Sequence, residues 1–281
     1  MTIDGIFNIF YGLIQGITEF IPISSSGHLN IIEILYKNIE SRNYLYETSA
    51  HFASLLALLI YLFVHKHFSK SNIKANFKVI VYATIPAVFL GIILKFYNLS
   101  FISLELIGYT SIIGAILLYI SDKPNKFKFV IKSKSTKFIF AGFFQCLAFL
   151  PGFSRAGSCI IAFRLFGEDR KYSSIYSLYM GIPIIGLSFF SNISDFESVT
   201  IDKGLFIVFF SSFFAAYITI SIFINFINKI GFTPFVVYRI LIGIVLLIYV
   251  YETLSINFLR YSEVIIFIFD RSCFNISVTN F

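Results

Sequence analysis

Two short polar stretches interrupt an otherwise apolar chain, and the first, EFIPISSSGHL, places an acid ahead of three serines and a histidine. Ser25 and His28 are spaced as neighbours on one face of a helix, which sets a hydroxyl beside an imidazole base. Glu19 precedes them, and Gln15 lies one helical turn before Glu19 on the same face. The stretch therefore supplies an acid or metal ligand, a candidate nucleophile and a proton acceptor.

The second stretch, PGFSRAGS, sets a guanidinium next to a serine. Arg155 carries a fixed positive charge in a planar fork that matches phosphate oxygens. Ser154 is either the N-cap of the helix that follows or a hydrogen-bond donor to phosphate. In the first stretch, Ser24 and Ser26 are better candidates for caps and backbone partners than for nucleophiles.

Both stretches begin a new helix within apolar sequence. Free N–H groups and the helix dipole make a helix N-terminus a site for anions, and two such ends facing one cavity suit a phosphate or a diphosphate. We therefore expect the serines and glycines at these ends to bind substrate, namely Ser24, Ser26, Gly27, Ser154 and Gly157.

Together these residues suffice for the hydrolysis of a phosphoester or a phosphoanhydride, with the phosphoryl charge stabilised by Arg155 and the helix ends. The candidate catalytic residues are Glu19, Ser25, His28 and Arg155. The attacking group stays open among the Ser25 hydroxyl, His28 itself, and a water molecule assisted by Glu19 or His28.

The composition of the whole chain indicates a membrane protein. Its 281 residues are 57% hydrophobic and only 13% charged, which is more apolar than a soluble domain of this size can bury. The net charge is +7, but many of the basic residues sit in two loops between apolar segments. They report orientation in the membrane, so we expect no nucleic-acid partner. The cysteine spacing favours neither a disulfide framework nor a zinc site.

Apolar segments of about 20 residues, the length that crosses a bilayer as a helix, predict transmembrane spans at residues 47–64, 79–97, 101–120, 173–190, 204–224 and 235–254. The lysine-rich loops HKHFSKSNIKANFK and DKPNKFKFVIKSKSTK are predicted to be cytoplasmic, and the acidic loop SNISDFESVTIDK to lie outside. Loop charge and the number of intervening spans agree.

Two further apolar regions, residues 6–36 and 138–167, are broken at Pro22 and at Pro151–Gly152 into pieces too short to cross. We interpret each region as a re-entrant hairpin that enters and leaves on one side. Lipid cannot satisfy unpaired N–H and C=O groups, so both breaks are expected to line a pocket.

The hairpins are predicted to enter from opposite sides, and each is followed by three spans. The fold class is therefore an all-α polytopic membrane protein with six transmembrane helices and two re-entrant helical hairpins in inverted repeats, at about 1–120 and 121–255. Residues 1–255 are expected to form one membrane domain, and residues 256–281 a C-terminal extension of unknown structure.

The motifs QGITEFIPISSSGHL and PGFSRAGS resemble the two signature stretches of the bacterial undecaprenyl-diphosphatase family, the BacA or UppP type, also called bacitracin resistance proteins. ATIPAVFLG, YSLYMGIPIIG and YRILIGIVLL resemble family segments in the same order, so the similarity covers roughly residues 5–250. The resemblance implies a membrane phosphatase that removes the terminal phosphate of the C55 lipid carrier diphosphate and so recycles the carrier for peptidoglycan and other envelope polymers. By position, the family's essential acid, candidate nucleophilic serine, histidine and motif arginine match Glu19, Ser25, His28 and Arg155.

The resemblance also implies a location in the bacterial inner membrane, with the site facing the periplasmic side, and a divalent cation, Mg²⁺ or Ca²⁺, with Glu19 and Gln15 as candidate ligands. The expected partners are a polyprenyl diphosphate and membrane lipids, and a homodimer stays open. Gln15 stands where many members have Glu, while Ala156 and Cys159 replace a serine and a threonine. If the lost groups help to hold metal or phosphate, metal affinity or rate is reduced.

Broken helices in inverted repeats are also typical of transporters, so a lipid flippase is the second hypothesis. A different membrane phosphatase family, with PSGH and SR-x5-H-x3-D motifs, is rejected because Ile161 and Leu165 occupy its His and Asp positions. Glu47 and His51 are spaced as a helical pair that either supports the site or lies at the membrane interface. Arg239 is interpreted as an anchor near the cytoplasmic end of the last span.

Overall fold

The computed structural model describes residues 3–35, 44–65, 70–97, 102–123, 131, 133–191 and 202–273. Helices and short connections account for all of this part of the chain, which contains no strand. The prediction of an all-α protein is therefore confirmed.

Six helices are long and apolar enough to cross a membrane. They agree with the predicted spans to within a few residues, except where α4, α9 and α10 extend further: α3 (Tyr44–Val64), α4 (Lys70–Phe96), α5 (Leu104–Asp122), α8 (Arg170–Ser191), α9 (Lys203–Ile230) and α10 (Thr233–Cys273). The predicted multi-pass architecture is confirmed. Much of the loop sequence that carries the topology signal, at 66–69, 124–130 and 192–201, lies outside the described residues.

The two interrupted regions form helix–break–helix units at the predicted places. Their helices are α1 (Ile3–Thr18) and α2 (Ser25–Leu35) in the first unit, and α6 (Lys134–Gln145), the 3₁₀ turn η1 (Cys146–Phe149) and α7 (Arg155–Leu165) in the second. We call residues 19–24 break 1 and residues 150–154 break 2. Each contains a proline, which has no N–H to continue a helix. Entry of the two units from opposite membrane faces stays a prediction.

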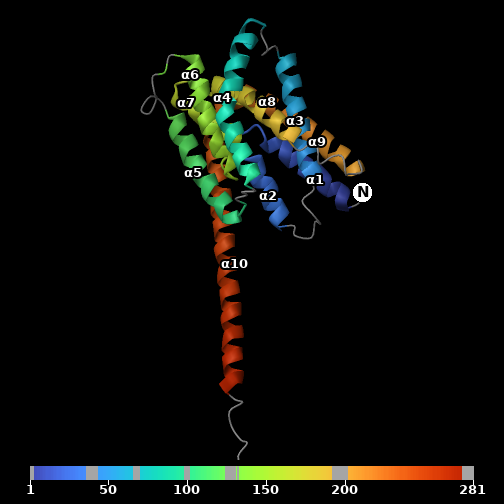
Figure 1. Cartoon of the computed structure of the whole chain (residues 1–281), viewed down its shortest axis with the longest axis vertical. Coiled ribbons are helices and arrows are strands. Elements are labelled where there is room, and N and C mark those ends of the chain that lie inside the picture. Colours follow the sequence, from blue (N-terminus) through green and yellow to red (C-terminus); the bar gives the residue numbers. More distant parts are fainter. Residues whose placement is uncertain are drawn as a thin grey trace, which may run out of the picture.

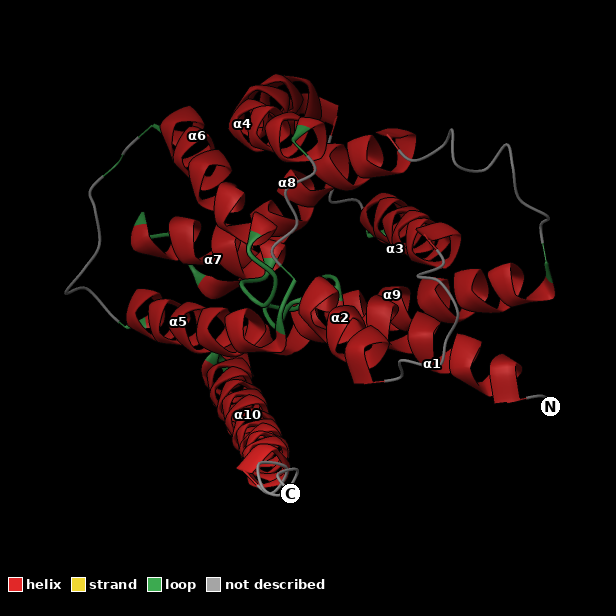
Figure 2. Cartoon of the chain, turned by 60° about the horizontal axis from the view of Figure 1, so that its bottom comes forward, coloured by secondary structure: helices red, strands yellow, loops and turns green. Residues whose placement is uncertain are grey.

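Helices of the two halves are interleaved. α1 packs along α9, α4 packs against α6, and α5 packs against α10, as Figure 2 shows. If α1 to α5 exchange places, in order, with α6 to α10, the contact between α1 and α9 becomes the contact between α6 and α4. The contact between α5 and α10 becomes itself. An inverted repeat would produce this pattern, and the repeat itself stays a prediction.

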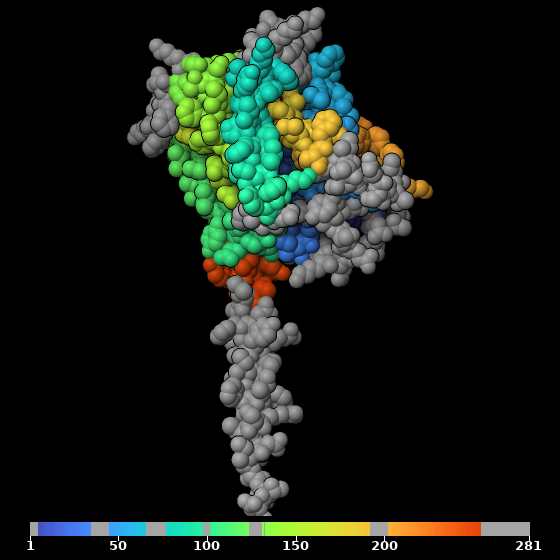
Figure 3. Space-filling view, viewed as in Figure 1, coloured from blue at the N-terminus to red at the C-terminus, as the bar shows by residue number. Residues whose placement is uncertain are grey.

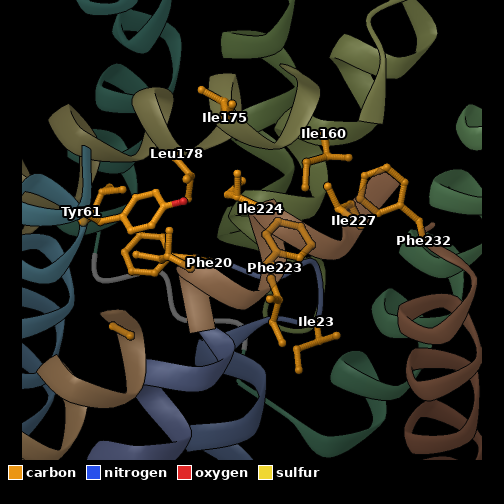
Figure 4. Close-up of a cluster of buried hydrophobic side chains, with 14 of the residues drawn as sticks. Phe20, Ile23, Tyr61, Ile160, Ile175, Leu178, Phe223, Ile224, Ile227 and Phe232 are labelled. Carbon is orange, nitrogen blue, oxygen red and sulfur yellow. The ribbon is translucent and has the colours of Figure 1, made fainter. Parts of the chain in front are cut away.

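A buried apolar cluster joins break 1 to α7, α8 and α9. Figure 4 shows Phe20 and Ile23 of the break among Leu178 of α8 and Phe223 of α9. Interiors of proteins are close-packed, so these side chains fix where the irregular backbone of the break lies.

The outer surface of the helical body is apolar. On the face shown in Figure 3, α4 runs along the surface, and it exposes large side chains such as Phe77, Phe89 and Phe96. An apolar outer face matches the acyl chains that surround a spanning helix.

The last helix is longer than a membrane span. α10 has 41 residues, which corresponds to about 60 Å or twice the hydrocarbon thickness of a bilayer. Its C-terminal part projects from the helical body in Figure 1. The predicted extension thus begins as a continuation of α10, and residues 274–281 lie outside the described part of the chain.

Candidate active site

Each break ends in a serine that caps the next helix. Ser24 and Ser154 have positive φ angles of 75° and 74°, a conformation that costs a side-chain-bearing residue about 1 kcal/mol or more. Their Oγ atoms accept hydrogen bonds from the N–H groups of Gly27, at 3.3 Å, and Gly157, at 3.1 Å. The capping role is confirmed for both serines, while Ser26 lies with its Oγ 3.4 Å from the Oγ of Ser24. Direct contact of these residues with substrate stays a prediction.

The two breaks lie against each other, as the sequence predicts. A Cβ atom on Gly27 would lie 3.2 Å from the Cα of Gly152, so the first turn of α2 packs directly on break 2. The turns of both breaks come together in the middle of Figure 2. The N-terminal ends of α2 and α7, with their partial positive charges, therefore lie close together.

Glu19 connects the residues of both breaks. Its Oε1 accepts a hydrogen bond from Arg155 Nη2 at 2.8 Å, and its Oε2 accepts from Ser25 Oγ at 2.7 Å and from Gln15 Nε2 at 2.9 Å. The carboxylate is almost wholly buried. The structure thus brings together three of the four predicted catalytic residues, Glu19, Ser25 and Arg155.

The guanidinium of Arg155 is held from several sides. It donates to the carbonyl oxygens of Ser177 and Glu19, both at 3.4 Å, and lies over the ring of Phe20 at 5.7 Å from the ring centroid. A side chain on Gly181 would overlap the guanidinium. Its orientation toward Glu19 is therefore set by α8 as well as by break 1.

His28, the fourth predicted residue, is bonded elsewhere. Its Nδ1 lies 2.6 Å from the carbonyl oxygen of Ser24, which only accepts, so Nδ1 carries the hydrogen. Its Nε2 lies 2.6 Å from the hydroxyl of Tyr238 on α10, and the two rings are stacked. The neutral ring accepts at Nε2, and the described hydrogen bonds do not join His28 to Ser25.

His51 belongs to the site. The sequence alone did not decide between this role and a pair with Glu47 at the membrane interface. Its Nδ1 lies 2.8 Å from Gln15 Nε2 and 3.5 Å from Glu19 Oε2. Its Nε2 lies 4.0 Å from Glu47 Oε1. The amide nitrogen of Gln15 only donates, so it bridges the carboxylate of Glu19 and the imidazole of His51. The helical spacing of Glu47 and His51 was the signal for this part of the site.

The interpretation of Arg239 as an anchor at the end of a span is wrong. Its side chain is fully buried, and its guanidinium donates to backbone carbonyls of both breaks, including Pro22 at 3.3 Å and Phe153 at 2.9 Å. The sequence signal for this buried position is an arginine within an apolar span, because such a charge is costly unless it has partners.

The site fits a divalent cation only together with substrate oxygens. Within the described ranges, no three His, Cys, Asp or Glu side chains are grouped closely enough to hold an ion. Glu19 supplies one carboxylate, and the buried Oε1 of Gln15 has no hydrogen-bond partner among the described atoms. One or two protein oxygens with substrate phosphates and waters is a common way of holding Mg²⁺.

The two departures in the second motif lie in buried positions. The thiol of Cys159 lies 3.3 Å from the side-chain oxygen of Gln145, and the carbonyl of Ala156 accepts from the hydroxyl of Ser177 at 3.1 Å. These contacts involve α6 and α8. They do not include Glu19, so they do not connect the departures directly to the carboxylate.

Comparison with known proteins identifies the family. The family model described as "Bacitracin resistance protein BacA" matches residues 8–245. A protein of Pelagibacter ubique (strain HTCC1062) named undecaprenyl-diphosphatase is 35% identical over 260 residues, which cover 87% of this chain and 97% of that protein. Proteins of the same name from Sulfurimonas denitrificans (33% over 257 residues, 86% of this chain and 97% of that protein) and Prochlorococcus marinus (31% over 263 residues, 85% and 97%) are also similar. The matched region includes both breaks and every residue of the site, and the chain belongs to the BacA family of bacitracin resistance proteins.

Proposed function

We propose that this protein hydrolyses undecaprenyl diphosphate to the monophosphate and inorganic phosphate, and so recycles the lipid carrier of envelope polymer synthesis and confers resistance to bacitracin. One observation supports this most strongly: the 2.8 Å ion pair between Glu19 and Arg155 joins the two breaks beside two helix N-terminal ends. A diphosphate at this point would contact a guanidinium, a hydroxyl and two positive helix ends. The names of the relatives agree with that chemistry.

The contact between Ser25 and Glu19 supports the first chemical step. In this step the Ser25 oxygen attacks the terminal phosphorus, its proton passes to Glu19 across the 2.7 Å hydrogen bond, and the bond from that phosphorus to the bridging oxygen breaks. Undecaprenyl monophosphate leaves with the bridging oxygen. Water then cleaves the phosphoserine, which releases inorganic phosphate and restores the Ser25 hydroxyl.

The positions of the other groups support a role for each of them in this step. Arg155 would exchange its partner Glu19 for the phosphoryl oxygens, which frees the carboxylate to accept a proton and stabilises the negative charge of the transition state. Because Nε2 of His28 already accepts from Tyr238, Glu19 is better placed than His28 to accept the proton of Ser25. Direct attack by water activated by Glu19 is the alternative that the geometry also allows.

A divalent cation would be held by Glu19 and the free Oε1 of Gln15 and, when bound, would neutralise charge on the phosphoryl oxygens. The proposal includes a location in the bacterial inner membrane, with the site opening to the outer side. The charge of the lysine-rich and acidic loops supports this orientation.

The test is phosphate release from a polyprenyl diphosphate in detergent, by the native protein and Arg155→Ala, each with and without chelator. The native protein is expected to release phosphate, and Arg155→Ala to lose about two orders of magnitude or more in kcat, as for removal of a preorganised charge partner. Lys229→Ala, at an exposed cation of α9, is the matched control and keeps the native rate. Near-native turnover of Arg155→Ala would exclude the assigned site.

The broken helices also allow a lipid flippase, and liposomes distinguish the two functions. If transport were the activity, Glu19→Ala would leave lipid movement between leaflets unchanged. If the protein is a phosphatase, phosphate release from liposomes stops in the same variant.

A further inference from the structure

Arg239 is the largest fully buried side chain in the described part of the chain. It lies in the apolar helix α10, and none of the ion pairs between described residues includes it. A charge in this position is costly unless its donors are satisfied. The partners of Arg239 therefore indicate why the charge is present.

Those partners are backbone carbonyls of both breaks and, at 3.4 Å from Nη2, of Thr110 on α5, while Nε has no partner among the described atoms. Nη1 donates to Pro22 of break 1 at 3.3 Å, and Nη2 donates to Gly152 at 3.1 Å and to Phe153 at 2.9 Å in break 2. Carbonyls at a helix break have lost their helical partners and cannot be satisfied by lipid. One guanidinium thus replaces the missing donors of both breaks and ties the breaks to each other.

The guanidinium of Arg239 lies close to the N-terminal end of α7. A Cβ atom on Gly114 of α5 would overlap it, and a Cβ atom on Gly157, in the first turn of α7, would lie 3.2 Å from Nη1. The positive charge of Arg239 is therefore directly behind a helix N-terminus, and no described carboxylate pairs with it. Its field adds to the dipole of that end.

We propose that Arg239 is a positioning residue with two separable effects. Its hydrogen bonds hold break 1 and break 2 in the register that pairs Glu19 with Arg155, and its uncompensated charge raises the affinity of the site for a diphosphate. The proposal rests on the proposed phosphatase function, because it concerns the same site.

Substitutions at Arg239 separate geometry from charge. Arg239→Lys keeps the charge but cannot bridge two segments with a planar fork, whereas Arg239→Gln removes the charge. We expect both variants to lose kcat by about 100-fold, a loss typical of a misplaced catalytic group. Binding of inorganic pyrophosphate, measured by isothermal titration calorimetry, should stay native-like in Arg239→Lys and weaken by about tenfold or more in Arg239→Gln. If Arg239 only stabilised the fold, Arg239→Lys and Arg239→Gln would change the pyrophosphate affinity alike.

Gly114→Ala provides a second test without touching the arginine. The added methyl displaces the guanidinium from the carbonyls, so kcat should fall as in Arg239→Lys while pyrophosphate binding is kept. Gly186→Ala on α8 is the matched control, because the nearest atom to its Cβ, Leu55 Cδ2, is 3.9 Å away. Gly114→Ala keeps the proposal testable if Arg239→Gln does not fold.

The outcomes are distinguishable from failure of the proposed function. If the native protein releases no phosphate, the function is wrong, but the calorimetric comparison of Lys and Gln still tests the charge of Arg239. If the native protein is active and Arg239→Gln matches it in kcat and in pyrophosphate affinity, the inference about Arg239 is overturned. Equal pyrophosphate affinity in the Lys and Gln variants would also contradict it.

Discussion

At the residue scale, the buried carboxylate of Glu19 joins residues from the two halves of the chain. Arg155 comes from one half, and Ser25 and Gln15 come from the other. Removing one partner of a buried ion pair leaves the other charge unpaired and costs about 3–5 kcal/mol. Arg155 can leave Glu19 without that cost only when another anion takes the place of the carboxylate, so the proposed diphosphate would open the ion pair as it binds.

The contact between His28 and Tyr238 gives a prediction at the same scale. Tyr238→Phe removes one hydrogen bond to the imidazole and should lower kcat by about tenfold. If the hydroxyl acts through the ring, the double variant with His28→Gln is no slower than His28→Gln alone. Steady-state phosphate release measures kcat for the two single variants and the double variant. Tyr249→Phe, which changes an exposed tyrosine on the same helix, is the control. Losses that add in the double variant would show that Tyr238 acts independently of His28.

At the element scale, the two breaks share one local design. In each, a proline-containing turn ends in a serine of positive φ that caps the third residue after it, a glycine. Caps satisfy N–H groups that a helix start leaves without partners. The same short pattern therefore produces both helix N-terminal ends.

Two glycines of positive φ test how closely break 2 is packed. Gly152 (φ 91°) and Gly167 (φ 82°) both resist a side chain, but only Gly152 is crowded, by Thr110 Oγ1 and by the Ile107 carbonyl. Gly167→Ala should cost about 1 kcal/mol of stability, from backbone strain alone. Gly152→Ala should cost about 2–4 kcal/mol, from strain and overpacking together, and should lower activity as well. Unfolding in detergent measures the stability of both variants. Equal losses of stability would show that break 2 is loosely packed.

At the scale of the whole molecule, the helices of each half pack mainly on helices of the other, and the two breaks lie between them. The family match ends at residue 245, whereas α10 continues to Cys273. Every side chain assigned to the site precedes the end of that match. The projecting part of α10 therefore follows the candidate site residues in the sequence and lies outside the family match.

Truncation checks this separation. A chain that ends at Thr253 should keep kcat within about twofold of the native value, because the removed segment lies beyond the packed body. A chain that ends at Leu241 loses Leu246, which packs with Leu104 and Ile107 of α5, and should not yield folded protein. Phosphate release and size-exclusion elution measure both. A large loss of activity on removal of the projecting segment alone would place that segment in the function.

Much of the fold could be predicted from the sequence because its signals are local. Long apolar runs predict spanning helices wherever they occur, and Pro22 and Pro151 end helices through their own missing N–H groups. Ser24 and Ser154 could be predicted as caps for the same reason. The proximity of Glu19, Ser25 and Arg155 followed from the expectation that interrupted helices meet, together with the family resemblance.

The sequence by itself determined that the protein is a helical membrane protein, where its helices break, and which motif residues are the candidates for the chemistry. Only the tertiary structure decided that Arg239 is buried between the breaks, that His51 contacts the carboxylate of Glu19, and that Tyr238 occupies the Nε2 of His28. Local interactions between neighbours in the chain set helices, caps and breaks. Contacts between residues more than a hundred positions apart, such as His28 with Tyr238, depend instead on how all the helices pack together, which no short pattern records.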